Sequence, residues 1–331
     1  MSHNSGVRSR ELKPKQGSRV EGYPLPTKKG WERIIEVTRA LLGFSRVIIA
    51  TFALAQAGLG AVLALQKLPP LRITLIGAIA VLSASYALTA TNDMLDVKID
   101  KKRFQSLRDF KGFDVGSLFI RHPLAQGVIS YKIAISWIAS LSVISMVFTF
   151  FLKPWLIGLF LIMVVLVSLY SFLNTITTWK IFIIAVFVAL GAVAGWLAVA
   201  SPTPLLYIFA LWMFCWEMGG RNIPNDFADV DEDMNLGLKT IPTVFGAKVA
   251  SRVAFVFLIL TCLTAIAIAV FAKLGLFFLV SSMLLGAILL LRPGYKLLKD
   301  PKPEISLQLF NFSTLYPLFM IFLLLFTFYA F

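Results

Sequence analysis

Long apolar runs recur along the whole sequence, and they restrict the possible fold more than any other feature. We count nine of them, at roughly 40–66, 71–92, 124–151, 154–173, 179–200, 203–220, 247–272, 274–291 and 306–330. A helix of about twenty apolar residues crosses the hydrocarbon core of a bilayer. These runs are continuous rather than alternating, which favours helices over a membrane barrel. The sequence therefore predicts an all-α integral membrane protein with nine transmembrane helices.

The formal net charge of +14 raises the alternative of nucleic-acid binding. The positions of the charges argue against nucleic-acid binding. Most Lys and Arg residues fall in the N-terminal tail or in loops on the same side of the membrane as that tail. The opposite side has only Lys67, Arg72, Lys153 and Lys273. Basic loops lie on the cytoplasmic side of membranes, next to anionic lipid. We therefore predict a cytoplasmic N-terminus, membrane lipids as partners and no nucleic acid.

Two regions follow from the distribution of polar residues. Residues 1–34 are polar and basic, as in a disordered cytoplasmic tail, and residues 35–331 form the membrane domain. Cys215 and Cys262 each lie alone in a predicted span, so neither a disulfide nor a cysteine metal site is predicted.

One acidic pattern occurs twice, each time directly after an apolar run. Residues 92–100 read NDMLDVKID and residues 225–233 read NDFADVDED, so both fit N-D-x-x-D-V-x-x-D. The two copies end the second and the sixth predicted helix. Four helices separate them, which predicts two four-helix repeats plus one helix, with both copies on the cytoplasmic face.

The spacing of the acidic residues predicts a metal site. In each copy the aspartates stand at i, i+3 and i+7, which is one face of a helix. Three carboxylates at a helix C-terminus repel one another and the helix dipole, unless cations compensate them. Mg²⁺ prefers carboxylate oxygens together with a substrate phosphate, and the spacing does not match a calcium-binding EF-hand loop. The predicted ligands are Asp93, Asp96, Asp100, Asp226, Asp229 and Asp233. The alternative is a set of solvated charges flanking the membrane.

These motifs resemble those of the UbiA-type intramembrane prenyltransferase superfamily, over nearly all of residues 35–330. Asn92 to Asp100 is similar to the family's N-D-x-x-D-x-x-x-D, and Asp229 to Asp233 is similar to its D-x-x-x-D. RHPLAQG (121–127) and GLKTIPTVFG (237–246) also look typical of the family. The resemblance implies nine helices around a central cavity, Mg²⁺ as cofactor, and transfer of a prenyl group from a prenyl diphosphate to a lipophilic, often aromatic acceptor.

The residues then receive expected roles. We assign catalysis to Asp93, Asp96, Asp229 and Lys239, which help the diphosphate to leave as charge develops on it. Substrate-binding roles are assigned to amide, cationic and aromatic side chains, namely Asn92, Asn225, Lys102, Arg103, Arg121, Arg46 and Tyr170. Arg46 lies inside an apolar run, where a cation is costly unless it meets an aspartate or a substrate anion.

The sequence departs from the family pattern at two places. The link 101–120 between the first motif and the Arg-Pro-Leu segment is longer than usual. Family members also often have a lysine four residues after the tyrosine that corresponds to Tyr170, whereas this chain has Asn174. Either a phosphate-binding cation is missing, or Lys180 replaces it.

Two other functions fit parts of the pattern. A terpene cyclase of the same fold would share the ionisation step and differ in needing no acceptor. A transporter would fit many helices, but the acids lie at one face rather than at mid-membrane depth. The sequence leaves open the acceptor, the prenyl chain length and the oligomeric state.

Overall fold

The computed structural model describes residues 30–106, 119–120 and 122–330, with only the backbone of residues 103–106. Two compact units can be separated, Met1–Glu36 and Val37–Phe331. The second unit contains both acidic motifs. Residues 1–29 of the predicted tail lie outside the described residues.

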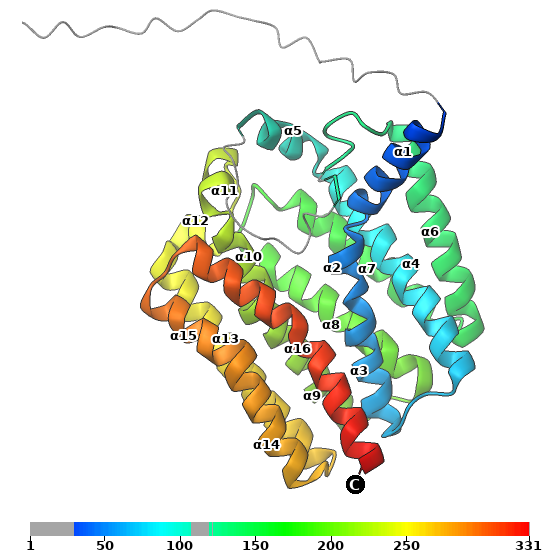
Figure 1. The fold of residues 1–331 in the computed structure, drawn as a ribbon, viewed down its shortest axis with the longest axis vertical. Helices are drawn as coiled ribbons and strands as arrows, with labels where there is room; N and C mark the ends of the chain where they lie inside the picture. Colours follow the sequence, from blue (N-terminus) through cyan, green and yellow to red (C-terminus); the bar gives the residue numbers. More distant parts are fainter. Residues whose placement is uncertain (1–29, 107–118, 121, 331) are drawn as a thin grey trace, which may run out of the picture. The chain divides into compact units, whose positions relative to one another are not determined.

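Helices make up the described secondary structure, and none of the described residues forms a strand (Figure 1). The first half consists of α1 (Trp31–Phe44), α2 (Val47–Thr51), α3 (Ala53–Leu65), α4 (Leu71–Leu95), α5 (Val97–Ser106), α6 (Tyr131–Leu152), α7 (Leu156–Phe172) and α8 (Lys180–Val199). The second half begins with α9 (Pro204–Trp216), the π-helical turn η2 (Glu217–Asn222), α10 (Ile223–Ala228), α11 (Val230–Leu236) and α12 (Ile241–Phe245). It ends with α13 (Ala247–Phe271), α14 (Gly275–Gly286), the π-helical turn η3 (Ala287–Leu291), α15 (Arg292–Lys299) and α16 (Pro303–Ala330).

Seven helical stretches among the described residues are long and apolar enough to cross a membrane. They make the chain an integral, multi-pass membrane protein. Two predicted spans are shorter as apolar helices: α7 has 17 residues and α9 has 13 before η2 begins. The predicted count of nine transmembrane helices is therefore not confirmed, and the central cavity stays a prediction.

Two predicted spans have different boundaries in the structure. The run 40–66 is broken at Arg46, whose φ of 44° lies in the left-handed region, so α1 ends before it and a separate span, Val47–Leu65, begins after it with α2 and α3. The run 124–151 becomes helical only at Tyr131. There Ser130 caps α6 by accepting a hydrogen bond from the Ile133 amide at 3.4 Å.

Two glycines allow α3 and α8 to pack with their backbones in close approach. A Cβ on Gly195 of α8 would collide with Ala57 of α3, whose Cα lies 2.7 Å away. A Cβ on Gly60 would lie 2.6 Å from the carbonyl oxygen of Ala192. Small residues at helix crossings are a common way to pack membrane helices, because lipid gives no hydrophobic driving force between them.

The turn η2 orients the second motif in a similar way. A Cβ on Gly219 would lie 2.7 Å from the Ala254 carbonyl oxygen of α13, and one on Gly220 would lie 2.9 Å from Ser313 Cβ of α16. The buried Trp216 donates from Nε1 to the Ser313 carbonyl at 2.9 Å. The chain leaving α9 is thus fixed between α13 and α16 before it enters α10.

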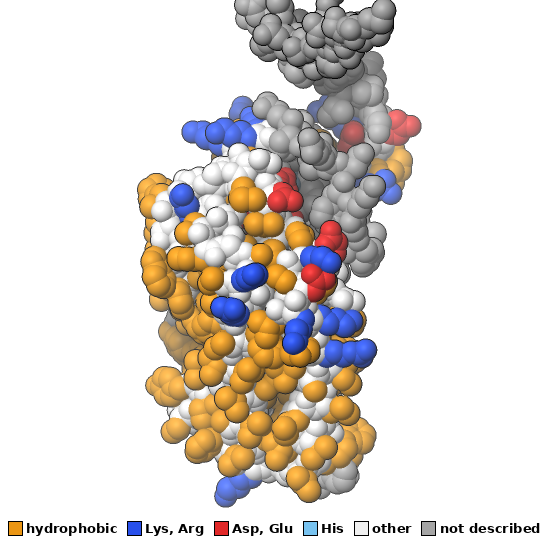
Figure 2. Space-filling model, turned by 90° about the vertical axis from the view of Figure 1, so that its left-hand side faces the viewer, with side chains coloured by type: hydrophobic (Ala, Val, Ile, Leu, Met, Phe, Trp, Pro, Cys, Tyr) orange, Lys and Arg blue, Asp and Glu red, His pale blue; other side chains and the backbone are white. Residues whose placement is uncertain are grey.

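Figure 2 shows how side chains are distributed over one face of the molecule. Hydrophobic side chains cover the lower half of this face, and most of the Lys, Arg, Asp and Glu side chains in view lie above them. This separation is typical of a protein whose apolar belt contacts lipid and whose charged end contacts water.

Candidate active site

The first motif lies at a break between two helices. α4 ends at Leu95, Asp96 occupies the junction with φ −85° and ψ 3°, and α5 begins at Val97. The helical hydrogen bonds continue across the junction, because the Asp96 amide donates to the Asn92 carbonyl and the Asp100 amide to the Asp96 carbonyl, both at 2.9 Å. Asp93 and Asp100 are buried, and Asp96 is partly buried.

The sequence predicts that the three aspartates of the first motif share one helix face, but only two of them point in the same direction in the structure. Asp93 and Asp100 both approach His122, whereas Asp96 is held by Asn92 and Asn174. Asp93 and Asp100 lie on either side of the junction and still meet at His122, so the first and third aspartates share a face while Asp96, at the junction itself, is turned to the two asparagines.

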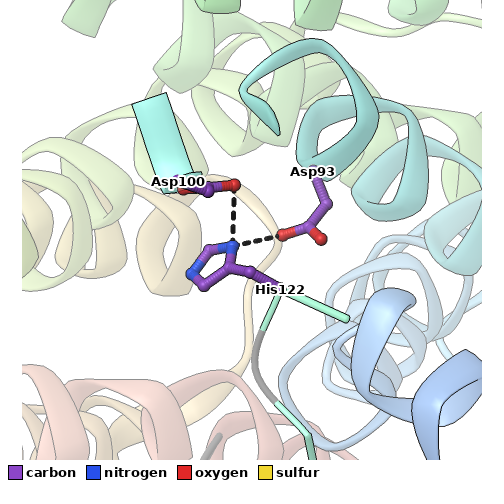
Figure 3. A group of neighbouring side chains, drawn as sticks. All are labelled: Asp93, Asp100 and His122. Carbon is purple, nitrogen blue, oxygen red and sulfur yellow. Dashed lines mark ion pairs between the residues drawn. The ribbon is translucent and has the colours of Figure 1, made fainter. Parts of the chain in front are cut away.

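His122 joins the two buried carboxylates (Figure 3). Its Nδ1 lies 2.7 Å from Asp93 Oδ1 and 2.8 Å from Asp100 Oδ2. Burial alone lowers the pKa of a histidine, but the two carboxylates outweigh burial here and raise the pKa of His122 above its ordinary value. The sequence motifs did not identify this residue. The sequence offered one indication of its role: His122 is one of only two histidines in the chain and stands directly before Pro123.

Asp96 is oriented by two amide side chains. Asn92 Nδ2 donates to Asp96 Oδ2 at 3.0 Å and to Ser171 Oγ at 2.7 Å. Asn174 Nδ2 lies 3.2 Å from Asp96 Oδ1 and 3.3 Å from Oδ2. Burial, reinforced by the charge of Asp100, raises the pKa of Asp96 to about 6. A carboxylate whose charge is disfavoured in this way gains stability when a cation binds beside it.

A buried lysine continues the network from Asp96. Lys180 Nζ, at the start of α8, donates to Asn174 Oδ1 and lies 5.1 Å from the centre of the Tyr170 ring. Lys180 is only 2% exposed. The backbone of Asn174 also accepts a hydrogen bond from the Lys239 amide at 2.8 Å. Asn174 therefore connects the first motif, a buried cation and the segment after the second motif.

The second motif has the same break as the first. Asp229 lies at the junction between α10 and α11, with φ −100° and ψ 16°. Asp226 and Asp233 are buried and Asp229 is partly buried. The two asparagines of the motifs differ, since Asn92 is partly buried and hydrogen-bonded while Asn225 is exposed.

Two observations place the motifs next to each other. Residues of α5 and α11, the short helices that follow the two breaks, contact each other. The Tyr170 hydroxyl also lies near Asn222, one turn before Asp226, and close enough to Asp96, Asp226 and Asp233 for their charges to act on it. The described fold thus brings the two acidic motifs to one region.

The predicted cationic residues divide into three groups. Arg46 Nη2 lies 3.5 Å from Asp93 Oδ1, so this arginine meets an aspartate, as the sequence predicted. Lys102 and Lys239 are exposed, on α5 and between α11 and α12. The Arg103 side chain and Arg121 lie outside the part of the chain that the structure describes.

The first motif has the donor set and the unsatisfied atoms that a divalent cation requires. One ligand atom each from Asp93, Asp100 and His122 lies within 4.8 Å of the other two. Asp93 Oδ2 is buried and has no hydrogen-bond partner among the described residues. Such an atom is costly unless a cation or water binds it. The residues present therefore fit a divalent metal ion.

The sequence matches the UbiA prenyltransferase family over residues 53–320. It is 25% identical over 254 residues to a digeranylgeranylglyceryl phosphate synthase of Thermococcus sibiricus, covering 74% of this chain and 81% of that protein. It is 26% identical over 218 residues to a 4-hydroxybenzoate octaprenyltransferase of Francisella tularensis, covering 66% and 72%. A solved UbiA homologue from Archaeoglobus fulgidus, bound to GPP and Mg²⁺, has a similar fold with a TM-score of 0.59 at 15% identity, covering 86% of this chain and 99% of that one.

The family match spans most of the chain, and the curated relatives and the fold agree with it. The chain belongs to the UbiA prenyltransferase family and is a membrane-embedded prenyltransferase.

Proposed function

We propose that the protein transfers a polyprenyl group from a prenyl diphosphate to a lipophilic acceptor within the membrane, and that the acceptor is aromatic or a quinone precursor. The observation that carries the proposal is the contact between α5 and α11, the short helices that follow the breaks in the two aspartate motifs. The homologue bound to GPP and Mg²⁺ supports the donor class. The positive-inside distribution of Lys and Arg supports a cytoplasmic location for the site.

Two groups of residues would act on the leaving diphosphate. Asp93, Asp96, Asp100, Asp226, Asp229 and Asp233 would hold Mg²⁺, which when bound neutralises the diphosphate as the allylic C–O bond breaks. Lys180 supplies a buried positive charge beside Asp96 for the same leaving group, with Asn174 holding its ammonium group in place. The acceptor attacks the allylic carbocation and releases a proton as the new bond forms, and the surrounding apolar helices keep water from reacting with the cation.

The test is transfer by the purified protein in detergent. Labelled geranyl, farnesyl and geranylgeranyl diphosphates are supplied with hydroxybenzoates, quinone precursors and glycerol phosphate lipids, in Mg²⁺ or in EDTA. We expect a prenylated aromatic product that requires the metal. A prenylated glycerol phosphate lipid would move the assignment to the acceptor class named for the Thermococcus relative. A cyclised hydrocarbon formed without acceptor would indicate a cyclase, and folded protein that releases no diphosphate from any donor would contradict the proposal.

Lys180 gives a separate prediction. We propose that it binds the diphosphate in place of the family lysine that this chain lacks at position 174. Lys180→Met keeps the length of the side chain and removes its charge. A hydrogen bond to a charged group contributes about 1.5–3 kcal/mol, so the KM for the prenyl diphosphate is expected to rise roughly ten- to a hundredfold. Steady-state kinetics with the donor varied measures this change.

The matched control is Lys248→Met, which removes an exposed lysine at the start of α13. It is expected to leave the KM unchanged. A melting curve of the Lys180→Met protein shows whether the fold is intact. An intact Lys180→Met protein with the wild-type KM would remove Lys180 from the donor site.

A further inference from the structure

His122 brings a nitrogen atom to the first aspartate motif from a different part of the chain. Asp93 belongs to the end of α4, Asp100 to α5, and His122 to the segment that precedes α6. Figure 3 shows the three side chains directed toward one another, with both carboxylates approaching the same ring nitrogen. All three residues are buried, with exposed fractions of 2%, 3% and 5%.

The distances between these atoms match those of neighbouring ligands around one metal ion. Metal–ligand bonds of about 2.1 Å at right angles place adjacent ligand atoms about 3.0 Å apart. The separations of 2.7 and 2.8 Å around Nδ1 are close to this value, so little movement is needed for the three atoms to bind one ion. The buried Asp93 Oδ2, which has no hydrogen-bond partner among the described residues, adds a further donor atom at the same place.

The backbone at His122 shows that this position of the imidazole is maintained at a cost. His122 has φ 48°, a left-handed conformation that is unfavourable for a residue with a side chain. Residues held in such conformations cluster at functional sites. Arg46, the other described cation at Asp93, lies farther from the carboxylate, at 3.5 Å.

We propose that Nδ1 of His122 is a ligand of the divalent cation bound by Asp93 and Asp100, which makes this half of the site a mixed nitrogen and oxygen site. The inference deepens the proposed function and rests on it only for the role of the metal. A site made of carboxylates alone suits Mg²⁺, whereas an imidazole ligand favours first-row transition metals, with Co²⁺ bound more tightly than Mn²⁺. The protein should therefore bind Co²⁺ and Mn²⁺ more tightly than Mg²⁺ at this motif.

The experiment detects the metal–nitrogen contact directly and needs no substrate. Full-length protein, purified without a histidine tag, is loaded with Mn²⁺ and studied by electron spin echo modulation. We expect modulation from a ¹⁴N nucleus of imidazole, which changes to the ¹⁵N pattern when the protein is grown with ¹⁵N-histidine. Because the chain has only two histidines, His122→Ala should abolish the modulation and His3→Ala should retain it.

A second readout is affinity, measured by calorimetry with Co²⁺ and with Mg²⁺. His122→Ala is expected to weaken Co²⁺ binding at least tenfold, and to weaken Mg²⁺ binding much less. The isotope experiment on the His3→Ala protein, in which His122 is the only histidine, decides the question even where His122→Ala fails to fold.

Three results would overturn the inference: bound Mn²⁺ without nitrogen modulation, modulation that survives His122→Ala, or no Mn²⁺ binding at millimolar concentration. Prenyl transfer in Mg²⁺ together with an oxygen-only Mn²⁺ spectrum would reject the histidine ligand and leave the proposed function intact. A nitrogen-coordinated metal in a protein that transfers no prenyl group would support the histidine ligand and reject the proposed function.

Discussion

Asp96→Asn is expected to lower the rate of prenyl transfer about a hundred- to a thousandfold, because the proposed Mg²⁺ ligands lose a charged oxygen and with it part of the stabilisation of the charge that develops on the leaving diphosphate. The substitution keeps the size of the side chain and removes its negative charge. Asp96 lies where α4 and α5 meet, between Asn92 and Asn174, and its pKa of about 6 reflects a buried charge. The loss should appear in kcat at saturating donor, because the carboxylate acts while the C–O bond breaks.

The matched control for this prediction is Asp231→Asn. Asp231 lies on α11 inside the second motif. Its side chain is exposed, and it is not at one of the three aspartate positions that the two motifs share. Its substitution also removes one negative charge and should leave kcat unchanged. Single-turnover release of labelled diphosphate measures both variants. Wild-type release by Asp96→Asn would exclude this carboxylate from the ionisation step.

Gly195→Ala is expected to be the most damaging substitution in the helix packing. The added methyl group would overlap the backbone of Ala57, which cannot move away as a flexible side chain can. Overpacking commonly costs about 1–3 kcal/mol, and we expect the upper end of this range because two helix backbones must separate. The measurement is the Tm of the detergent-solubilised protein, which should fall by several degrees.

Gly191→Ala tests the same change one turn earlier in α8. A Cβ at Gly191 meets no atom within 4 Å, so this variant should keep the wild-type Tm. Equal melting temperatures for the two variants would contradict the close crossing of α3 and α8.

Local pattern was enough to predict much of the fold. Runs of about twenty apolar residues form helices in lipid whatever surrounds them, since their backbone hydrogen bonds close within the segment. The helical state, the multi-pass topology and the family followed from these runs and from the two aspartate motifs. Where prediction was wrong, a single residue had interrupted the pattern, such as Arg46 in a left-handed conformation inside the run 40–66.

The spacing of the aspartates along the sequence did not predict the helix breaks inside the two motifs. The i, i+3, i+7 pattern assumes one straight helix, but Asp96 and Asp229 each end one helix and precede another. Contacts between distant residues also surround the first break. Asn174 binds the Asp96 side chain from 78 positions along the chain.

The sequence by itself therefore determined the helices, the membrane location and the residues that carry negative charge, because each depends on neighbours in the chain. Only the tertiary structure decided which polar groups meet: His122 with Asp93 and Asp100, Lys180 with Asn174, and α5 with α11. These contacts join residues far apart in sequence and depend on how α3, α8 and η2 pack. No periodicity along the chain encodes that packing, since it arises from close approaches such as those at Gly195 and Gly219.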